Sequence, residues 1–225
     1  MIVVTGASRG LGRSISERLA SKGYEICGVA RTVFPASFEL ASVDVASEAQ
    51  VREFARAIRD RGIPVTCLIN AAGVAAMNLA LMAPPATVRS LVATNLFGTM
   101  FMCQSIAPLM IRAGGGSIIN FSTIAVSLAL AGESAYVASK AGVEAYSRTL
   151  ARELARHSIS VNCIAPGPID TELLRGVSAE QRSSVVGQQI IQRQFEAQDV
   201  CDVVELMIDP RSRSLTGHVL HIGGV

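Results

Sequence analysis

Short runs of apolar, β-branched residues alternate along this chain with longer stretches in which apolar residues recur at helical spacing. The strand-like runs cover residues 2–4, 25–30, 40–43, 65–70, 117–121, 160–164 and 218–221. The helix-like stretches cover residues 10–22, 48–60, 86–111, 134–157 and 197–207. Strict alternation of this kind predicts right-handed β-α-β units, and therefore an α/β fold built on a parallel sheet.

No internal repeat or linker divides the 225 residues, so the sequence predicts one domain spanning residues 1–225. Half of the residues are hydrophobic and only 4% are aromatic, as expected for a sheet that helices bury on both faces. Residues 167–195 form the one long connection without clear periodicity. Such a connection at the carboxyl end of a sheet predicts a lid over a binding site.

Charge and cysteine usage exclude several classes of protein. The formal net charge is +2 without a basic block, so neither a nucleic acid nor a membrane is an expected partner. The five cysteines are scattered and form no CxxC pair, which predicts buried thiols in a reducing compartment. The three histidines lie far from acid or cysteine clusters, so no metal site is expected. Together these features predict a cytoplasmic protein.

A glycine-rich turn, Thr5-Gly6-Ala7-Ser8-Arg9-Gly10-Leu11-Gly12, follows the first predicted strand and opens the first predicted helix. Glycines let a backbone approach a pyrophosphate, and free N–H groups at a helix N-terminus bind it. The segment Gly6 to Gly10 also fits GxSxG, the nucleophile elbow of hydrolases. Only seven residues precede Ser8, however, whereas an elbow follows several strands and a loop that supplies half of the oxyanion hole.

Tyr136 and Lys140 are four residues apart in a predicted helix and therefore share one face. A nearby ammonium group lowers the pKa of a phenol, which would let Tyr136 act as a general acid or base on a carbonyl or alcohol. Thr123 follows the predicted strand 117–121, where its hydroxyl would hydrogen-bond a substrate oxygen. Asn95 is a mediocre helix former in the middle of a long predicted helix, which indicates a polar role there.

With these motifs in order, the chain resembles the short-chain dehydrogenase/reductase family over essentially its whole length. The resemblance rests on the glycine turn, Asp44, Asn70-Ala71-Ala72-Gly73, Asn95, the Thr123/Tyr136/Lys140 set, and Pro166-Gly167 with Thr171. It implies a single-domain, Rossmann-type, doubly wound parallel sheet of about seven strands with helices on both faces. It also implies that Tyr136 donates the proton, Lys140 binds the nicotinamide ribose and lowers the tyrosine pKa, and Asn95 holds a water in a proton relay.

The cofactor implied by the resemblance is NADP(H). Enzymes that prefer NAD place an acid after the second strand, whereas Ala30 stands at that position here and Arg31 follows it. Arg31 and Arg9 would bind the 2′-phosphate through charge-assisted hydrogen bonds. The residues expected to contact the cofactor are Gly6, Ser8, Arg9, Gly10, Leu11, Gly12, Arg31, Asp44, Val45, Asn70, Ala71, Gly73, Tyr136, Lys140, Pro166, Gly167, Ile169 and Thr171.

Two departures from the family pattern affect the predicted site. Thr123 stands where the family has a serine, while the side chain of the adjacent Ser122 should point to the opposite face of an extended strand. Only twelve residues separate Arg31 from Asp44, and they include a predicted strand. The helix that usually lies there should be missing, which would leave the adenosine end of the site more open.

The segment 166–175 most resembles that of 3-oxoacyl-[acyl-carrier protein] reductases of fatty acid biosynthesis. The resemblance implies reduction of a 3-oxoacyl thioester to the 3-hydroxyacyl thioester, with Arg175 contacting the acidic carrier protein. It also implies a homodimer or homotetramer. Two alternatives stay open: a carbonyl or polyol reductase acting on a small free substrate, and a non-catalytic NADPH-binding protein.

Overall fold

Seven parallel strands form one sheet in the computed structural model, which describes residues 1–171 and 178–225. The strands are β1 (Ile2–Thr5), β2 (Ile26–Ala30), β3 (Glu39–Ser42), β4 (Cys67–Asn70), β5 (Gly116–Phe121), β6 (Ile159–Ala165) and β7 (Val219–His221). Their spatial order is β3-β2-β1-β4-β5-β6-β7. The strand order therefore reverses between β1 and β4, and ligands of doubly wound folds bind at the carboxyl ends of the strands beside this switch point.

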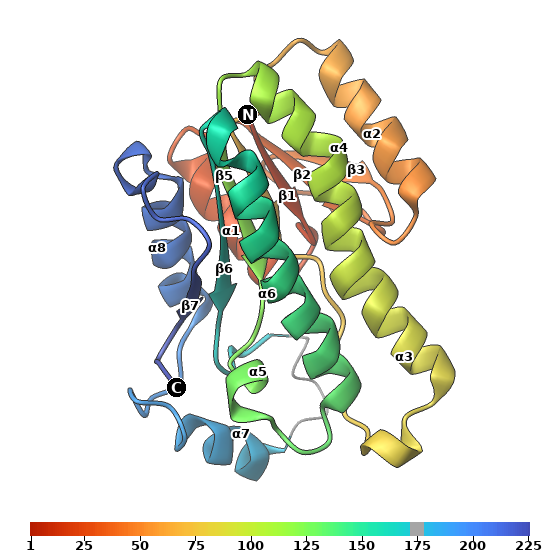
Figure 1. Ribbon diagram of the computed structural model, residues 1–225, viewed down its shortest axis with the longest axis vertical. Helices are drawn as coiled ribbons and strands as arrows, with labels where there is room; N and C mark the ends of the chain where they lie inside the picture. Colours follow the sequence, from red (N-terminus) through yellow and green to blue (C-terminus); the bar gives the residue numbers. More distant parts are fainter. Residues whose placement is uncertain (172–177) are drawn as a thin grey trace.

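Helices cover both faces of the sheet, which confirms the predicted architecture (Figure 1). One face carries α2 (Glu48–Asp60), α4 (Gly98–Arg112) and α6 (Ser134–Leu154), and the other carries α1 (Gly10–Ser21) and α8 (Ala197–Ile208). The remaining helical segments are η1 (Ala80–Met82), α3 (Pro85–Leu91), η2 (Val92–Phe97), α5 (Ala125–Leu128), η3 (Ala155–His157), α7 (Ala179–Val186) and η5 (Pro210–Ser212).

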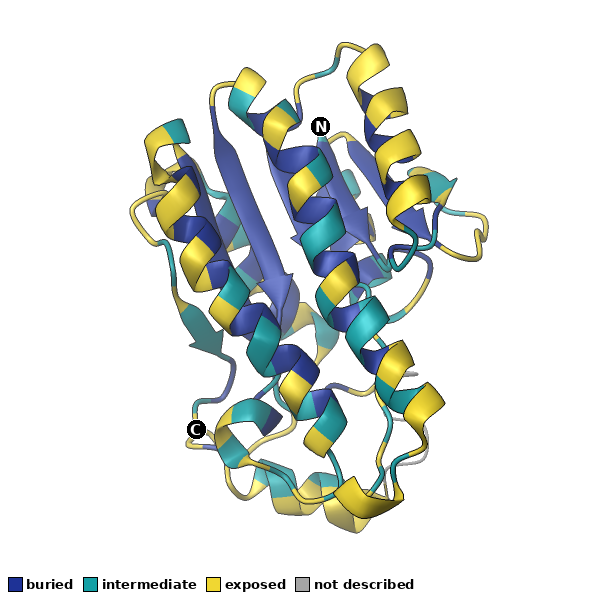
Figure 2. Cartoon of the chain, turned by 45° about the vertical axis from the view of Figure 1, so that its right-hand side comes forward, coloured by how far each residue is buried: buried dark blue, intermediate teal, exposed yellow. Residues whose placement is uncertain are grey.

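The apolar runs of the central strands are buried because each face of the sheet packs against its own cluster of helical side chains (Figure 2). On one face Val3, Leu68 and Ile118 meet Met102 and Ile106 of α4. Only the edge strands β3 and β7 are partly exposed among the seven described strands. The two packed layers hold the carboxyl ends of the central strands as a rigid platform.

The long helix predicted over residues 86–111 is wrong in one respect, because it is interrupted in its middle. The π-helical segment η2 separates α3 from α4, and the backbone N–H of Gly98 donates to the carbonyl of Ala93, five residues back. Such π-helical turns are rare and occur frequently at functional sites. This one carries Asn95.

The connection over residues 167–195 is not entirely irregular, since it contains α7. Ser178 and Gln181 form a capping box at the start of that helix, which satisfies N–H groups of its first turn. The predicted absence of a helix between β2 and β3 is confirmed: residues 31–38 pass from one strand to the next without regular structure. Phe34 in this loop is half-exposed.

All five cysteines lie within the described residues, and all are buried and unpaired, as predicted. Burial raises the pKa of Cys67 and of Cys103 to about 12, so both stay protonated at neutral pH. Among the helices that the structure describes, none has the length and apolar character to cross a membrane.

The glycine-rich turn brings two backbone segments into direct contact. A Cβ atom on Gly12 would lie 2.4 Å from the carbonyl oxygen of Gly6, and one on Gly6 would lie 2.9 Å from the carbonyl oxygen of Ala71. Gly6 also has a φ of +69°, which side chains other than glycine rarely adopt. The turn after β1 and the loop after β4 therefore pack so closely that no side chain fits between them.

The Gly12→Ala substitution should destabilise the fold by roughly 1–3 kcal/mol, because the added methyl overlaps backbone atoms that cannot rotate away. Thermal unfolding should show a Tm lower by several degrees. Gly187→Ala is the matched control, since its Cβ would lie 3.5 Å from the Ser183 carbonyl oxygen at a φ of −65°. Equal stability of the two variants would contradict the close approach at Gly12.

Candidate active site

A cavity of about 900 Å³ opens at the carboxyl ends of the strands, beside the switch point between β1 and β4. It runs from the glycine turn and the β2–β3 loop, past the ends of β4 and β5, to α6 and α7. The residues of the predicted site that line it are Gly6, Ser8, Arg9, Gly10, Leu11, Gly12, Arg31, Asp44, Val45, Ala71, Gly73, Thr123, Tyr136, Lys140, Pro166, Gly167, Ile169 and Thr171. Residues from distant parts of the sequence thus share one cavity.

The N-terminus of α1 faces this cavity and fits a phosphate group. Its N-cap residue, Arg9, makes no side-chain capping bond, and the first turn carries no acidic residue. No side chain of the described residues caps this turn, so its first N–H groups can bind an anion, which the helix dipole also favours. Arg9 and Arg31 line the same end of the cavity. These residues fit a dinucleotide whose pyrophosphate lies on the glycine turn.

Tyr136 lies in the first turns of α6, with only 9% of its surface exposed. Burial raises the pKa of its phenol well above the ordinary value, and the nearby Glu133 carboxylate raises it further. A hydrogen bond from the Thr123 side chain opposes these effects by favouring the phenolate. The phenol is therefore protonated at neutral pH and faces the Thr123 hydroxyl across the cavity.

Lys140 is anchored to the end of β5, and its predicted effect on the pKa of Tyr136 stays a prediction. Its ammonium Nζ donates a hydrogen bond of 2.7 Å to the backbone carbonyl of Phe121. Burial lowers the pKa of Lys140 itself from 10.5 to about 8. The lysine is thus held at the end of β5, one helical turn beyond Tyr136.

Ser122 and Thr123 point in different directions, as an extended strand requires. The Ser122 hydroxyl donates a hydrogen bond of 2.6 Å to the buried carboxylate of Glu144 on α6. The Thr123 hydroxyl oxygen instead accepts a hydrogen bond of 3.2 Å from the backbone N–H of Ala125. Because Ser122 is held by Glu144, the Thr123 side chain is the one that faces Tyr136.

Asn95 does not line the cavity but holds part of its wall. Its side-chain oxygen accepts from the backbone N–H of Val74, and its amide group donates to the Val74 carbonyl and to the Ser139 hydroxyl, at 2.9–3.0 Å. The residue is completely buried. Its side chain therefore connects the π-helical segment to the loop after β4 and to α6.

Asn70 is an exception to the predicted cofactor set. Its amide group donates to Asn120 Oδ1 on the neighbouring strand β5 at 2.8 Å and to Cys103 Sγ on α4 at 3.3 Å, and the residue does not line the cavity. Its side chain points into the core because these polar partners lie there. Arg175, the expected carrier-protein contact, lies outside the described residues.

Several lining residues were not found by sequence reasoning. They include Val29, Thr32, Phe34, Val43, Val74, Ala75, Ala76, Met77, Thr94, Phe121, Ile124, Ala125, Leu130, Glu133, Pro168, Arg182 and Val185. Most are small or apolar and carry no motif. Glu133 was the detectable one, because it lies one turn before Tyr136 in the sequence. The hydrolase alternative gains nothing from the structure, since His221 Nε2 lies 3.0 Å from the hydroxyl of Ser127 rather than near Ser8.

Comparison with known proteins agrees with this geometry. The family model described as short chain dehydrogenase matches residues 1–182, and the chain belongs to that family. The protein is therefore an oxidoreductase of a class that uses a nicotinamide cofactor.

Individual relatives match almost end to end. The 3-oxoacyl-[acyl-carrier-protein] reductase of Escherichia coli is 30% identical, over 99% of this chain and 95% of that protein. A mouse protein of the same description is 34% identical, over 98% of this chain and 95% of its own length. The ligand-free structure of Thermoplasma acidophilum aldohexose dehydrogenase superposes with a TM-score of 0.91 at 27% identity, covering 99% of this chain and 92% of that one.

The buried ammonium of Lys140 should reduce the stability of the nucleotide-free protein at neutral pH. Folding lowers its pKa from 10.5 to about 8, so the unfolded state binds more protons between these values and the cost fades as the pH rises through them. Lys140→Met should therefore raise the free energy of unfolding at pH 7 by about 1–2 kcal/mol, after the lost hydrogen bond is counted.

The advantage of Lys140→Met should shrink as the pH rises from 8 towards 10. Urea unfolding of both proteins across this pH range measures the effect. A variant that is less stable than the parent at pH 7 would show that the Phe121 hydrogen bond outweighs desolvation of the ammonium.

Proposed function

We propose that this protein reduces a ketone to a secondary alcohol with NADPH as the hydride donor. The observation that carries this proposal is the shared cavity, in which the Tyr136 phenol and the Thr123 hydroxyl face each other beyond a phosphate-binding helix N-terminus. A dinucleotide bound along the cavity would reach from the glycine turn to these two hydroxyls. When bound, NADPH supplies a hydride to the carbonyl carbon.

In this mechanism Thr123 orients the substrate carbonyl and donates a hydrogen bond to its oxygen. Tyr136 then gives its proton to that oxygen as negative charge develops there. The phenol of Tyr136 is protonated at neutral pH and can therefore act as the proton donor. Lys140 would bind the nicotinamide ribose, and Asn95 keeps the loop after β4 in position through its hydrogen bonds to Val74.

The preference for NADPH rests on the charges at the adenosine end of the cavity. Arg9 and Arg31 both line that end, while Ala30 occupies the position where an acid would bind a ribose 2′-hydroxyl. Guanidinium groups bind phosphate strongly, because their positive charge and paired N–H donors match the phosphate oxygens. The open β2–β3 loop leaves room for the additional phosphate.

Two substrate classes compete for the site. The relatives described as 3-oxoacyl-[acyl-carrier-protein] reductases support a 3-oxoacyl thioester, for which Arg175 would contact the carrier protein. A small hydroxylated carbonyl compound is supported by the Glu133 carboxylate in the cavity wall and by the aldohexose dehydrogenase with a similar structure. In both cases the family's usual assembly, a homodimer or homotetramer, is part of the proposal.

The Tyr136→Phe substitution tests the reaction. It removes the acidic hydroxyl with little change in packing, so kcat for reduction of a 3-oxobutanoyl N-acetylcysteamine thioester or a simple ketone should fall by about 100-fold or more. Fluorescence titration should show unchanged NADPH affinity. A near-normal kcat would remove Tyr136 from the mechanism, and a parent protein that binds NADPH but reduces no ketone would indicate a non-catalytic binding protein.

The Arg9→Ala/Arg31→Ala double substitution tests the cofactor. Each charge-assisted hydrogen bond to the 2′-phosphate contributes roughly 1.5–3 kcal/mol, so the Kd for NADPH should rise at least about 100-fold. The Kd for NADH, which lacks this phosphate, should change little. Arg52→Ala, on the exposed side of α2, is the control. A parent protein that binds NADH as tightly as NADPH would refute the assignment.

A further inference from the structure

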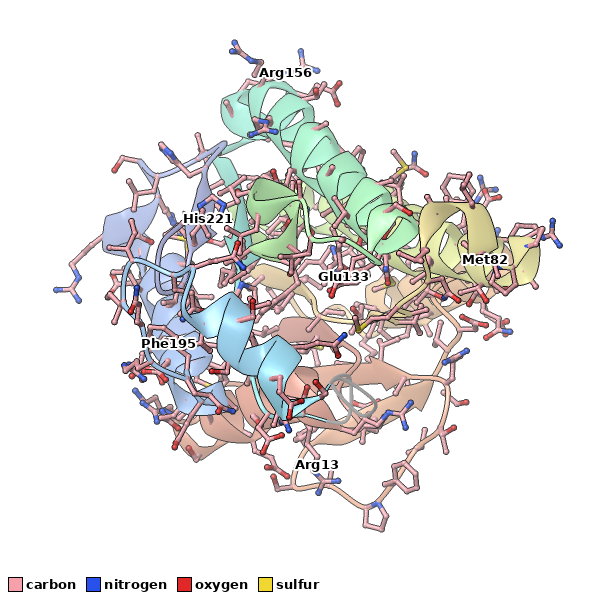
Figure 3. All side chains as sticks on the ribbon, turned by 90° about the horizontal axis from the view of Figure 1, so that it is seen from below. Arg13, Met82, Glu133, Arg156, Phe195 and His221 are labelled. Carbon is pink, nitrogen blue, oxygen red and sulfur yellow. The ribbon has the colours of Figure 1, made fainter. Side chains whose placement is uncertain are left out.

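Glu133 is a carboxylate on the wall of the cavity, immediately before α6 and three residues before Tyr136. Figure 3, which looks onto the carboxyl ends of the strands, shows it between the N-terminal end of α6 and α7. The wall is fixed at this point, because the backbone N–H of Asn78 donates a hydrogen bond of 2.7 Å to the carbonyl of Gly132. Glu133 lines the same cavity as Tyr136, and its carboxylate is near enough to raise the pKa of that phenol, so it lies beside the part of the cavity that a substrate of Tyr136 would occupy.

The carboxylate of Glu133 has no hydrogen-bond or ion-pair partner among the described residues, although it is partly buried. Two other charged groups of the cavity are engaged. The Asp44 carboxylate accepts the backbone N–H of Ala46 at 3.0 Å, and Arg182 lies 3.6 Å from Asp170. Burial raises the pKa of Glu133, because water is removed from the carboxylate and no protein donor replaces it.

An unpaired carboxylate in a cavity wall costs free energy until a donor reaches it. Apolar surroundings, including Met77 and Leu130, line the same part of the cavity and offer no donor from their side chains. None of the described residues supplies a donor to this carboxylate, so it is available to a donor on a bound substrate. A hydroxyl group close to the reacting carbonyl would supply such a donor.

We propose that Glu133 is a specificity-determining residue that accepts a hydrogen bond from a hydroxyl group on the carbon next to the substrate carbonyl. The assignment rests on the proposed function, because Tyr136 fixes where the carbonyl oxygen lies. It selects hydroxylated ketones or aldehydes over plain acyl chains as the substrates of this site. A carboxyl group at the same carbon would be rejected by charge repulsion.

Two substrates of equal size test this proposal. In 1-hydroxy-2-butanone a hydroxyl replaces one terminal methyl of 3-pentanone, so the pair differs only in the group that Glu133 would bind. The kcat/KM for each is measured at saturating NADPH for the parent, Glu133→Leu, Glu133→Gln and the control Glu53→Leu, which alters an exposed glutamate on α2.

The quantity compared is the ratio of kcat/KM for the hydroxyketone to that for the plain ketone. In Glu133→Leu this ratio should fall about 10-fold or more, mainly through the KM for the hydroxyketone. Glu133→Gln should keep part of the ratio, because its amide oxygen still accepts a hydrogen bond. Any effect of Glu133 on the proton transfer by Tyr136 acts on both substrates and cancels in the ratio.

An unchanged ratio in Glu133→Leu, with 3-pentanone still reduced, would overturn the assignment of Glu133 and leave the proposed function intact. An equal fall in the Glu53→Leu control would also overturn it. Reduction of neither ketone by the parent protein would instead overturn the proposed function, and with it the role of Glu133.

Discussion

Three consecutive residues at the end of β5 each lie against one face of α6, and the arrangement of the site depends on these contacts. The carbonyl of Phe121 accepts from Lys140, the hydroxyl of Ser122 donates to Glu144, and the Thr123 side chain lies beside the phenol of Tyr136. The α6 partners are spaced four residues apart and so follow one stripe of the helix. A strand end and a helix are thereby fixed in one register.

This register is costly to maintain, because it requires an ammonium and a carboxylate to be buried within the same interface. The free energy comes from the apolar layers on either side of the sheet, where residues such as Ile118 and Val143 are completely buried. The apolar core thus compensates for the buried polar contacts between β5 and α6 (hereafter the seam), which would be unfavourable by themselves. Rigidity at the seam keeps the two hydroxyls of the site opposed before any ligand binds.

The sequence was sufficient for the fold, because apolar runs and helical spacing record which faces are buried. It was insufficient at η2, since buried positions such as Leu91, Asn95 and Met102 keep a regular helical spacing through the π-helical turn. The helix α7 had a readable signal in the capping box of Ser178 and Gln181, but its weak apolar pattern concealed it.

The candidate site shows the same division. The motif spacing was enough to predict that Tyr136, Thr123 and the glycine turn share one cavity, while their chemical roles stay predictions. The hydrogen-bond partner of Lys140 could not be predicted, because it is a backbone carbonyl and every residue has one. The orientation of the Asn70 side chain could not be predicted either, because its hydrogen-bond partners Asn120 and Cys103 lie on other elements.

The short connection between β2 and β3 has a consequence for how the molecule opens. Where a helix would cover this part of the sheet, the ring of Phe38 packs over Gly28 instead, and the preceding residues 31–35 are exposed. Segments with so few apolar contacts open at a small fraction of the free energy of global unfolding, and their amide hydrogens exchange first. The seam between β5 and α6 lies on the far side of β1 and β4 from this loop. A local opening at the β2–β3 edge would therefore widen the cavity there without separating β5 from α6.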